Sequence, residues 1–183
     1  MKKLLPLLLL TFVFLSFVEK PLEVRKIYAD NSSSSIMYFM SHPLHDWDAS
    51  AKTFKTVISY DDATKEIKSV ASVVKVQSFD SGNSNRDSHA IEVLDALKNP
   101  NITFASNNIQ QAGEKLTIDG KLTFHGVTKP VTLNAIRKDS KSAMTVTGKM
   151  NVNMTDHGVK PPGLMGMNTK ENIRIDFTMT FKM

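Results

Sequence analysis

Histidine is the side chain in this sequence best suited to metal binding or proton transfer, because its pKa lies near neutrality. The chain has five histidines and no cysteine. His42 and His45 lie three positions apart, but the proline between them disfavours a helix that would align their rings. The other three are dispersed, without a tight group of carboxylates. We therefore expect no metal and no cofactor, and we expect His125, beside a turn, to make a structural hydrogen bond.

Serine, histidine and aspartate are all present, but catalysis by these residues requires a defined arrangement. The chain has no Gly-x-Ser-x-Gly segment, which would present a nucleophilic serine on a sharp turn. The sequence therefore predicts no catalytic residues and a protein that is not an enzyme.

A polar cluster of another kind is formed by Arg86, Asp87 and His89. A guanidinium can bind phosphate oxygens through two parallel hydrogen bonds, which would suit a charged headgroup. Alternatively, Asp87 caps a helix that begins here, while Arg86 pairs with a neighbouring carboxylate or carbonyl. Trp47 likewise either borders a cavity or anchors a loop. The residue types alone leave both interpretations open.

The first residues have the features of a secretory signal peptide. Met1, Lys2 and Lys3 precede an apolar run from Leu4 to Val18, which is short of the roughly 20 residues that span a membrane. We assign residues 1–29 to a signal peptide with a short linker, or alternatively to an uncleaved membrane anchor. Residues 30–183 then form one domain, and the protein is expected to be periplasmic or secreted.

The charge of the mature chain is small. Residues 1–29 hold five basic and two acidic side chains, so their removal lowers the formal charge from +5 to +2. The remainder has no dense basic patch of the kind that a phosphate backbone requires, so nucleic acid is not an expected partner. Without cysteine, the fold must be held by side-chain packing and backbone pairing.

The segment from Leu122 to Leu133 predicts a β-hairpin. Apolar residues at 116, 118, 122 and 124 share one parity and polar residues share the other, as in a half-buried strand. The alternation resumes after the break, with a slip at Ile136 and with Arg137 beyond it. Gly126 tolerates positive φ and Pro130 lacks an N–H, so we place the break between them.

Most of the remaining chain also predicts strands, at residues 36–40, 54–60 and 67–79, from 102, and at 144–154 and 173–181. One helix is expected near residues 86–98, with Ala90, Val93, Leu94 and Leu97 on its apolar face and Ser84 as its cap. The fold class is therefore all-β: a single antiparallel β-barrel of about eight strands with one short helix. A β-sandwich would fit the same alternation.

Three segments resemble the YceI-like family, whose members are lipocalin-like and include polyisoprenoid-binding periplasmic proteins. They are the hairpin at 122–133, the helix start at 84–89, and the strand start at 99–104. Their order and spacing agree with the family across roughly residues 30–182, and His42 fits the histidine that ends the family's first strand. The chain departs from the family pattern at 43–48 and 153–158, so the identity of the ligand does not carry over.

The resemblance implies an elongated apolar barrel cavity that holds a long-chain lipid. The residues expected to line it are Phe104, Ile118, Leu122, Phe124, Val146, Met150, Val152, Ile175, Phe177 and Met179. Those expected at its mouth or around a polar headgroup are His42, Trp47, Arg86, Asp87 and His89. From alternation alone, a solid core is the competing interpretation, although the flexible methionines suit an irregular ligand.

The function expected from the resemblance is sequestration or transport of an isoprenoid or another long-chain amphiphile outside the cytoplasm. Membrane contact through the N-terminal segment or during lipid exchange is expected with it, and family members can form homodimers. The alternative is a structural or interaction protein of the envelope or of a stress response, with a filled barrel acting through its surface.

Overall fold

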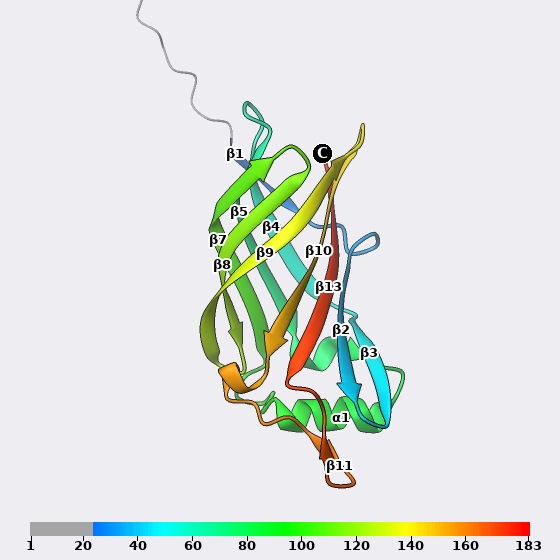
Figure 1. Cartoon of the computed structure of the whole chain (residues 1–183). Helices are drawn as coiled ribbons and strands as arrows, with labels where there is room; N and C mark the ends of the chain where they lie inside the picture. Colours follow the sequence, from blue (N-terminus) through cyan, green and yellow to red (C-terminus); the bar gives the residue numbers. More distant parts are fainter. Residues whose placement is uncertain (1–23) are drawn as a thin grey trace, which may run out of the picture.

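Within residues 24–183, the part of the chain that the computed structural model describes, eleven strands form one continuous antiparallel sheet that curls on itself (Figure 1). Its strands are β1 (Val24–Tyr28), β2 (Ser35–His42), β3 (His45–Ala51), β4 (Phe54–Asp61), β5 (Glu66–Lys75), β6 (Phe79–Asp80), β7 (Asn101–Ala112), β8 (Lys115–Phe124), β9 (Val127–Asp139), β10 (Ala143–Asn153) and β13 (Asn172–Lys182). Their order in the sheet is β1-β4-β5-β7-β8-β9-β10-β13-β2-β3-β6.

The remaining elements lie mostly at one end of the sheet. The helix α1 (Ser84–Val93) runs across the lower end in Figure 1, near the small hairpin of β11 (Gly163–Leu164) and β12 (Met167–Asn168). Two single 3-10 turns, η1 (Val76–Ser78) and η2 (Thr155–His157), follow β5 and β10. Neither α1 nor the two turns could span a membrane, and the apolar run at 4–18 lies outside the described residues.

The curled sheet forms a half-barrel, in which the chain after β1 reaches β13 and the chain after β3 reaches the segment before β6. Beyond β1, Ala29 forms a bridge with Phe181, and the N–H of Asp30 donates to the carbonyl of Thr180 at 2.8 Å. Near the helix end, the N–H of Lys52 donates to the carbonyl of Ser78 at 2.8 Å. The expected all-β class, with an antiparallel barrel-like sheet and one helix, is confirmed.

Side-chain alternation places the core inside the curl. In β10 and β13, inward-facing residues pair directly across the strands, as Met150 does with Ile175. The largest fully buried side chains, Phe181, Leu116 and Met144, belong to one buried cluster, and a second cluster around Phe124 lies nearer α1. Alternation therefore predicted which face of these strands is buried.

The sheet has eleven strands rather than about eight, because β1 and β3 were not predicted from the sequence. β1 begins at Val24, inside the segment 1–29 that we assigned to the leader and its linker. In β3, the acidic residues Asp46 and Asp48 alternate with half-buried Trp47 and buried Ala49. Two carboxylates in so short a segment are typical of a loop, so the strand was not predicted. The expected strand at 67–79 is also divided, because the chain turns at η1 before β6.

The helix is shorter than expected and is capped by another residue. Asn83, not Ser84, is the N-cap, and its side-chain oxygen accepts the N–H of Arg86 at 3.1 Å. The carboxylate of Asp87 accepts the N–H of Ser81 at 3.1 Å, which ties the helix to the segment before it. Leu97, expected on the apolar face, follows the helix and is 88% exposed.

The β8–β9 turn consists of His125 and Gly126, with φ of +50° and +73°. Two consecutive residues with positive φ are typical of a tight two-residue hairpin. Pro130 is not at the break but inside β9, opposite Lys121. It is tolerated because β9 pairs with β10 only from Asn134 onward, so this part of β9 lacks a second neighbour that would need the missing N–H.

Candidate functional site

An apolar cavity of about 160 Å³, here called the barrel cavity, lies inside the curled sheet. All ten residues expected to line a cavity do line it: Phe104, Ile118, Leu122, Phe124, Val146, Met150, Val152, Ile175, Phe177 and Met179. Protein cores rarely leave voids of this size, and apolar ones stay dry and accept apolar molecules. The barrel is therefore not solid, while the part these residues take in ligand binding stays a prediction.

Two glycines make room for aromatic rings in the wall of the barrel cavity. A Cβ atom at Gly148 would lie 2.5 Å from the ring of Phe177, and one at Gly120 would lie 2.5 Å from the ring of Phe104. Because neither glycine carries a side chain, the two rings lie close against the sheet. The signal in the sequence was a glycine on the inward parity of each strand.

A second cavity of about 120 Å³, here called the helix cavity, lies between the sheet and α1. It is lined by three of the residues expected at a mouth, namely Trp47, Arg86 and His89. The two cavities share wall residues, so they are neighbouring parts of one apolar interior. The shared residues are Phe79, Ile102, Phe124, Ile173 and Ile175.

Arg86 provides the cationic group of the helix cavity. Its guanidinium carbon lies 5.3 Å from the centroid of the Trp47 ring, within the range of a cation–π contact. Among residues 24–183, no carboxylate or carbonyl is hydrogen-bonded to this guanidinium, so the expected alternative partner for Arg86 is absent there. Burial raises the pKa of the nearby Tyr38 hydroxyl, which keeps that group neutral. A charged guanidinium next to apolar walls can therefore receive an anion.

The other predicted mouth residues have different positions. His42 is buried and lines neither cavity: its Nδ1 accepts the N–H of Leu44 at 3.2 Å, and its Nε2 lies 3.1 Å from the carbonyl of Met167. Both contacts suit a neutral ring protonated on Nε2, which links the β2–β3 turn to the β11–β12 hairpin. Asp87 also lines neither cavity, since its carboxylate is bonded to Ser81. His89 lines the helix cavity, but its side chain is largely exposed.

The histidines do not form a metal centre in the described part of the chain, where no three histidine, aspartate or glutamate side chains gather as ligands. The ring Nδ1 of His125 lies 3.1 Å from the carbonyl of His157. The ring Nδ1 of His157 lies 3.0 Å from the carbonyl of Val127. Because a carbonyl can only accept, both rings donate from Nδ1. The structural hydrogen bond expected for His125 is therefore present.

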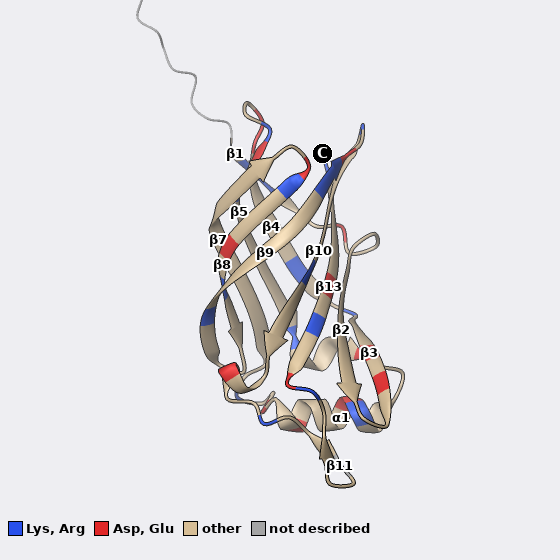
Figure 2. Ribbon diagram, viewed as in Figure 1, with Lys and Arg blue, Asp and Glu red and all other residues tan. Residues whose placement is uncertain are grey.

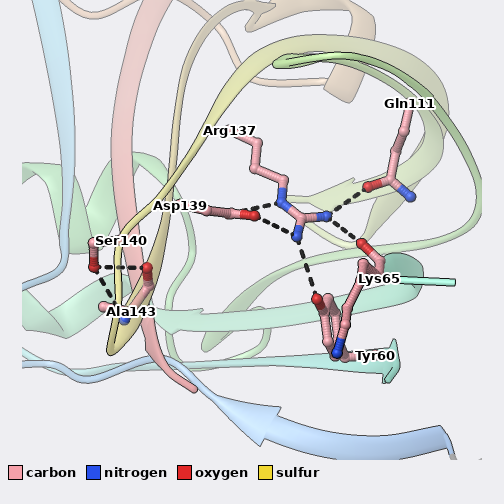
Figure 3. A network of polar contacts seen from close by, with 7 residues as sticks. All are labelled: Tyr60, Lys65, Gln111, Arg137, Asp139, Ser140 and Ala143. Carbon is pink, nitrogen blue, oxygen red and sulfur yellow. Dashed lines mark hydrogen bonds and ion pairs between the residues drawn. The ribbon is translucent and has the colours of Figure 1, made fainter. Parts of the chain in front are cut away.

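The end of the barrel opposite α1 contains a buried arginine, Arg137, whose position was not predicted from the sequence. Alternation does not slip at Ile136, which faces outward, so Arg137 continues the inward parity of Leu133 and Ala135. Arg137 is 8% exposed and forms the polar network in Figure 3. The signal that could have located it was the unbroken parity of 131, 133, 135 and 137. Elsewhere, charges of both signs are interspersed over the strands and loops (Figure 2).

Comparisons with known proteins agree with this geometry. The model of the YceI-like domain matches residues 28–181. A UPF0312 protein of Pseudomonas fluorescens strain SBW25 is 35% identical over 151 residues, covering 77% of this chain and 75% of that protein. BcnA of Burkholderia cenocepacia has a TM-score of 0.74 at 22% identity, covering 83% of this chain and 98% of its own. A polyisoprenoid binding domain from Saccharophagus degradans has a TM-score of 0.68 at 13% identity, covering 87% and 99%. The two structures establish a shared fold.

Proposed function

Because this chain belongs to the YceI-like family, we propose that it binds a long-chain lipid such as a polyisoprenoid and holds it without chemical change. The observation that carries the proposal is the apolar interior formed by the barrel cavity and the helix cavity. The solved domain from Saccharophagus degradans, named for polyisoprenoid binding, supports the same ligand class. The two cavities would hold the tail of one lipid, with its polar end near Arg86.

The energetics favour tight binding with little selectivity along the tail. Each buried CH₂ group contributes about 0.8 kcal/mol, so a dozen buried carbons offer on the order of 10 kcal/mol before ordering costs. The wall contains flexible Met150 and Met179, which can change rotamer to follow an irregular chain. A long occupant requires such movements where the barrel cavity meets the helix cavity. The polar end would then chiefly fix the orientation of the lipid.

The setting that we propose is the periplasm or the extracellular space, on the basis of the basic and apolar residues that open the chain. There the protein would carry a lipid that water does not dissolve and would exchange it at membranes. We propose no catalytic step, because tight binding of the tail requires only burial of apolar surface.

The test is mass spectrometry of an organic extract of the protein purified from its own host without detergent. We expect one long-chain species in stoichiometric amount, and we expect emptied protein to take up a prenyl alcohol of similar length. Protein that is both empty as isolated and unable to take up prenyl alcohols would contradict the proposal and favour a role exerted through the surface.

A further inference from the structure

The barrel cavity ends at one layer of inward-facing side chains, on the side away from α1. This layer, here called the plug, consists of Tyr60, Ala135, Arg137 and Met144, all of which are buried. None of the four lines the barrel cavity, although their neighbours do. The tail of a lipid that enters beside α1 would therefore meet the plug at the far end.

Strand register places the plug directly against the cavity wall. Ile58, Leu133 and Val146 line the barrel cavity, and each lies two positions along its strand from a member of the plug. Val146 is also the cross-strand partner of Arg137. Side chains of paired residues lie on the same face of a sheet, so Arg137 and Val146 are neighbours inside the barrel.

The guanidinium of Arg137 is fixed by hydrogen bonds on all of its nitrogens (Figure 3). Nε and Nη2 donate to the carboxylate of Asp139 at 2.9 and 2.8 Å. Nη1 donates to the carbonyl of Lys65 at 2.7 Å and to the side chain of Gln111 at 3.0 Å. Nη2 also lies 3.3 Å from the hydroxyl of Tyr60. These five contacts use the five N–H groups of the guanidinium.

A buried guanidinium whose five N–H groups are all hydrogen-bonded has no free donor for a headgroup. Because these bonds hold it in place, it also blocks an apolar tail. Displacing Arg137 would break several charge-assisted hydrogen bonds and would remove the donor that faces the hydroxyl of buried Tyr60. The cavity wall, by contrast, contains apolar side chains that can change rotamer at small cost. The tail can therefore widen the barrel cavity sideways more easily than it can lengthen it past the plug.

We propose that Arg137 sets the longest tail that fits wholly inside the barrel, and this inference rests on the proposed lipid binding. Inward-facing residues of one strand are about 6.6 Å apart, and barrel strands tilt by about 40°. Clearing the Arg137 side chain should therefore lengthen the cavity by roughly 5 Å along its axis, about one isoprene unit.

The experiment measures the affinity of the full chain for all-trans prenyl alcohols that differ by one isoprene unit. Trp47, the single tryptophan, lines the helix cavity and reports binding through its fluorescence. For the wild type, affinity should rise with length and then stop rising at a cut-off length. Arg137→Ala should move this cut-off upward by about one isoprene unit. Arg137→Met is the matched comparison: it loses the same hydrogen bonds but still fills most of the space with a flexible side chain, so its cut-off should move less than that of Arg137→Ala.

A second variant tests the opposite change without touching the network. Val146→Phe adds bulk to the cavity wall beside Arg137 and should lower the cut-off, whereas Thr147→Phe adds the same ring on the outer face and should leave it unchanged. This pair decides the question if Arg137→Ala does not fold.

Three results would overturn the inference in distinguishable ways. A wild-type protein that binds every length with no cut-off would leave lipid binding standing and refute the barrier. Equal cut-offs for Arg137→Ala and Arg137→Met, with the wild-type cut-off in Val146→Phe, would also refute the barrier and leave lipid binding standing. Failure of every protein to bind any prenyl alcohol, together with an isolated protein that contains no lipid, would refute the proposed function and the inference together.

Discussion

Two arginines face the interior, and their surroundings give them different properties. Arg137 is buried and hydrogen-bonded on every nitrogen, so its guanidinium has no free N–H group for a ligand. Arg86 lies over the face of Trp47, and the structure as described gives its guanidinium no anionic partner. An aromatic face stabilises a cation without occupying its N–H groups. Arg86 is therefore the arginine able to bind a ligand headgroup.

The first prediction concerns Arg86. Arg86→Ala should weaken binding of a prenyl phosphate, which gains charge-assisted hydrogen bonds from the guanidinium, by about tenfold or more, equivalent to about 1.4 kcal/mol. Binding of the corresponding prenyl alcohol should change much less. Lys98→Ala, which removes a largely exposed cation, is the control. Equal losses for phosphate and alcohol would show that Arg86 does not contact the headgroup.

The second prediction concerns Met150, whose side chain packs against both buried clusters. Met150→Trp should reduce lipid uptake, because the larger ring occupies space in the barrel cavity, at a cost in stability of about 1–3 kcal/mol. Circular dichroism should still show a β-rich fold. Asn151→Trp places the same ring on the exposed face and should leave uptake unchanged. Full uptake by Met150→Trp would contradict the placement of Met150 beside the ligand.

At the scale of elements, α1 acts as a cover over the lower end of the barrel. None of its residues from Ser84 to Val93 is fully buried, and Ala96 in the following turn is the residue that packs tightly. A helix of ten residues is marginal without tertiary packing, so its hydrogen-bonded ends matter. The element that covers the helix cavity is therefore among the easier parts of the fold to open.

The third prediction follows from the cap of this helix. Asn83→Ala removes the oxygen that accepts the N–H of Arg86 and should destabilise α1 by about 1 kcal/mol. Because α1 covers the helix cavity, release of bound lipid should become faster, as measured by transfer to acceptor vesicles. Ser84→Ala is the matched control, since Ser84 makes no capping bond, and its release rate should stay that of the wild type. Equal rates in all three proteins would mean that lipid leaves by another route.

At the scale of the whole molecule, the chain after β1 and the end of β13, which are far apart in sequence, are joined by polar contacts. The carboxylate of Asp30 pairs with the ammonium of Lys182 at 2.7 Å and accepts a hydrogen bond from the hydroxyl of Ser32 at 2.8 Å. The ion pair with Lys182 lowers the pKa of Asp30 strongly. At the β4–β5 turn, the backbone N–H of Thr64 lowers the pKa of Asp61. Both carboxylates are therefore stabilised in their charged form.

The fourth prediction is a loss of stability in acid. A carboxylate whose pKa is lower in the folded state stabilises the protein above its unfolded pKa of about 3.9, and that contribution disappears as the pH falls through the folded value. The melting temperature should therefore fall as the pH is lowered from about 5 towards 2. Asp30→Asn, which cannot ionise, should be less stable near neutrality and should show a flatter dependence. An identical slope for wild type and variant would show that Asp30 does not carry the effect.

The sequence alone determined the inward face of the main strands, because a strand with one buried face must alternate with a period of two. This rule placed the expected wall residues on the inward face, whereas the expectation that they surround a cavity came from the family resemblance. It could not show that their side chains leave space between them, since alternation is the same for a filled and a hollow barrel. The ring of Phe177 lies close against Gly148 of the neighbouring strand. The alternation within one strand does not specify this contact between strands.

Only the tertiary structure decided the roles of the polar residues. His42 and Arg86 both looked suited to a mouth, yet His42 bonds to Met167, distant in sequence, while Arg86 reaches the helix cavity. Arg137 looked like the residue after a strand pattern, but it faces inward and lies at the end of the interior away from α1. The role of a polar side chain depends on whether its donors and acceptors have hydrogen-bond partners. In these residues, the partners come from distant parts of the chain. Local periodicity specifies the face of a residue, and the curled sheet specifies its neighbours.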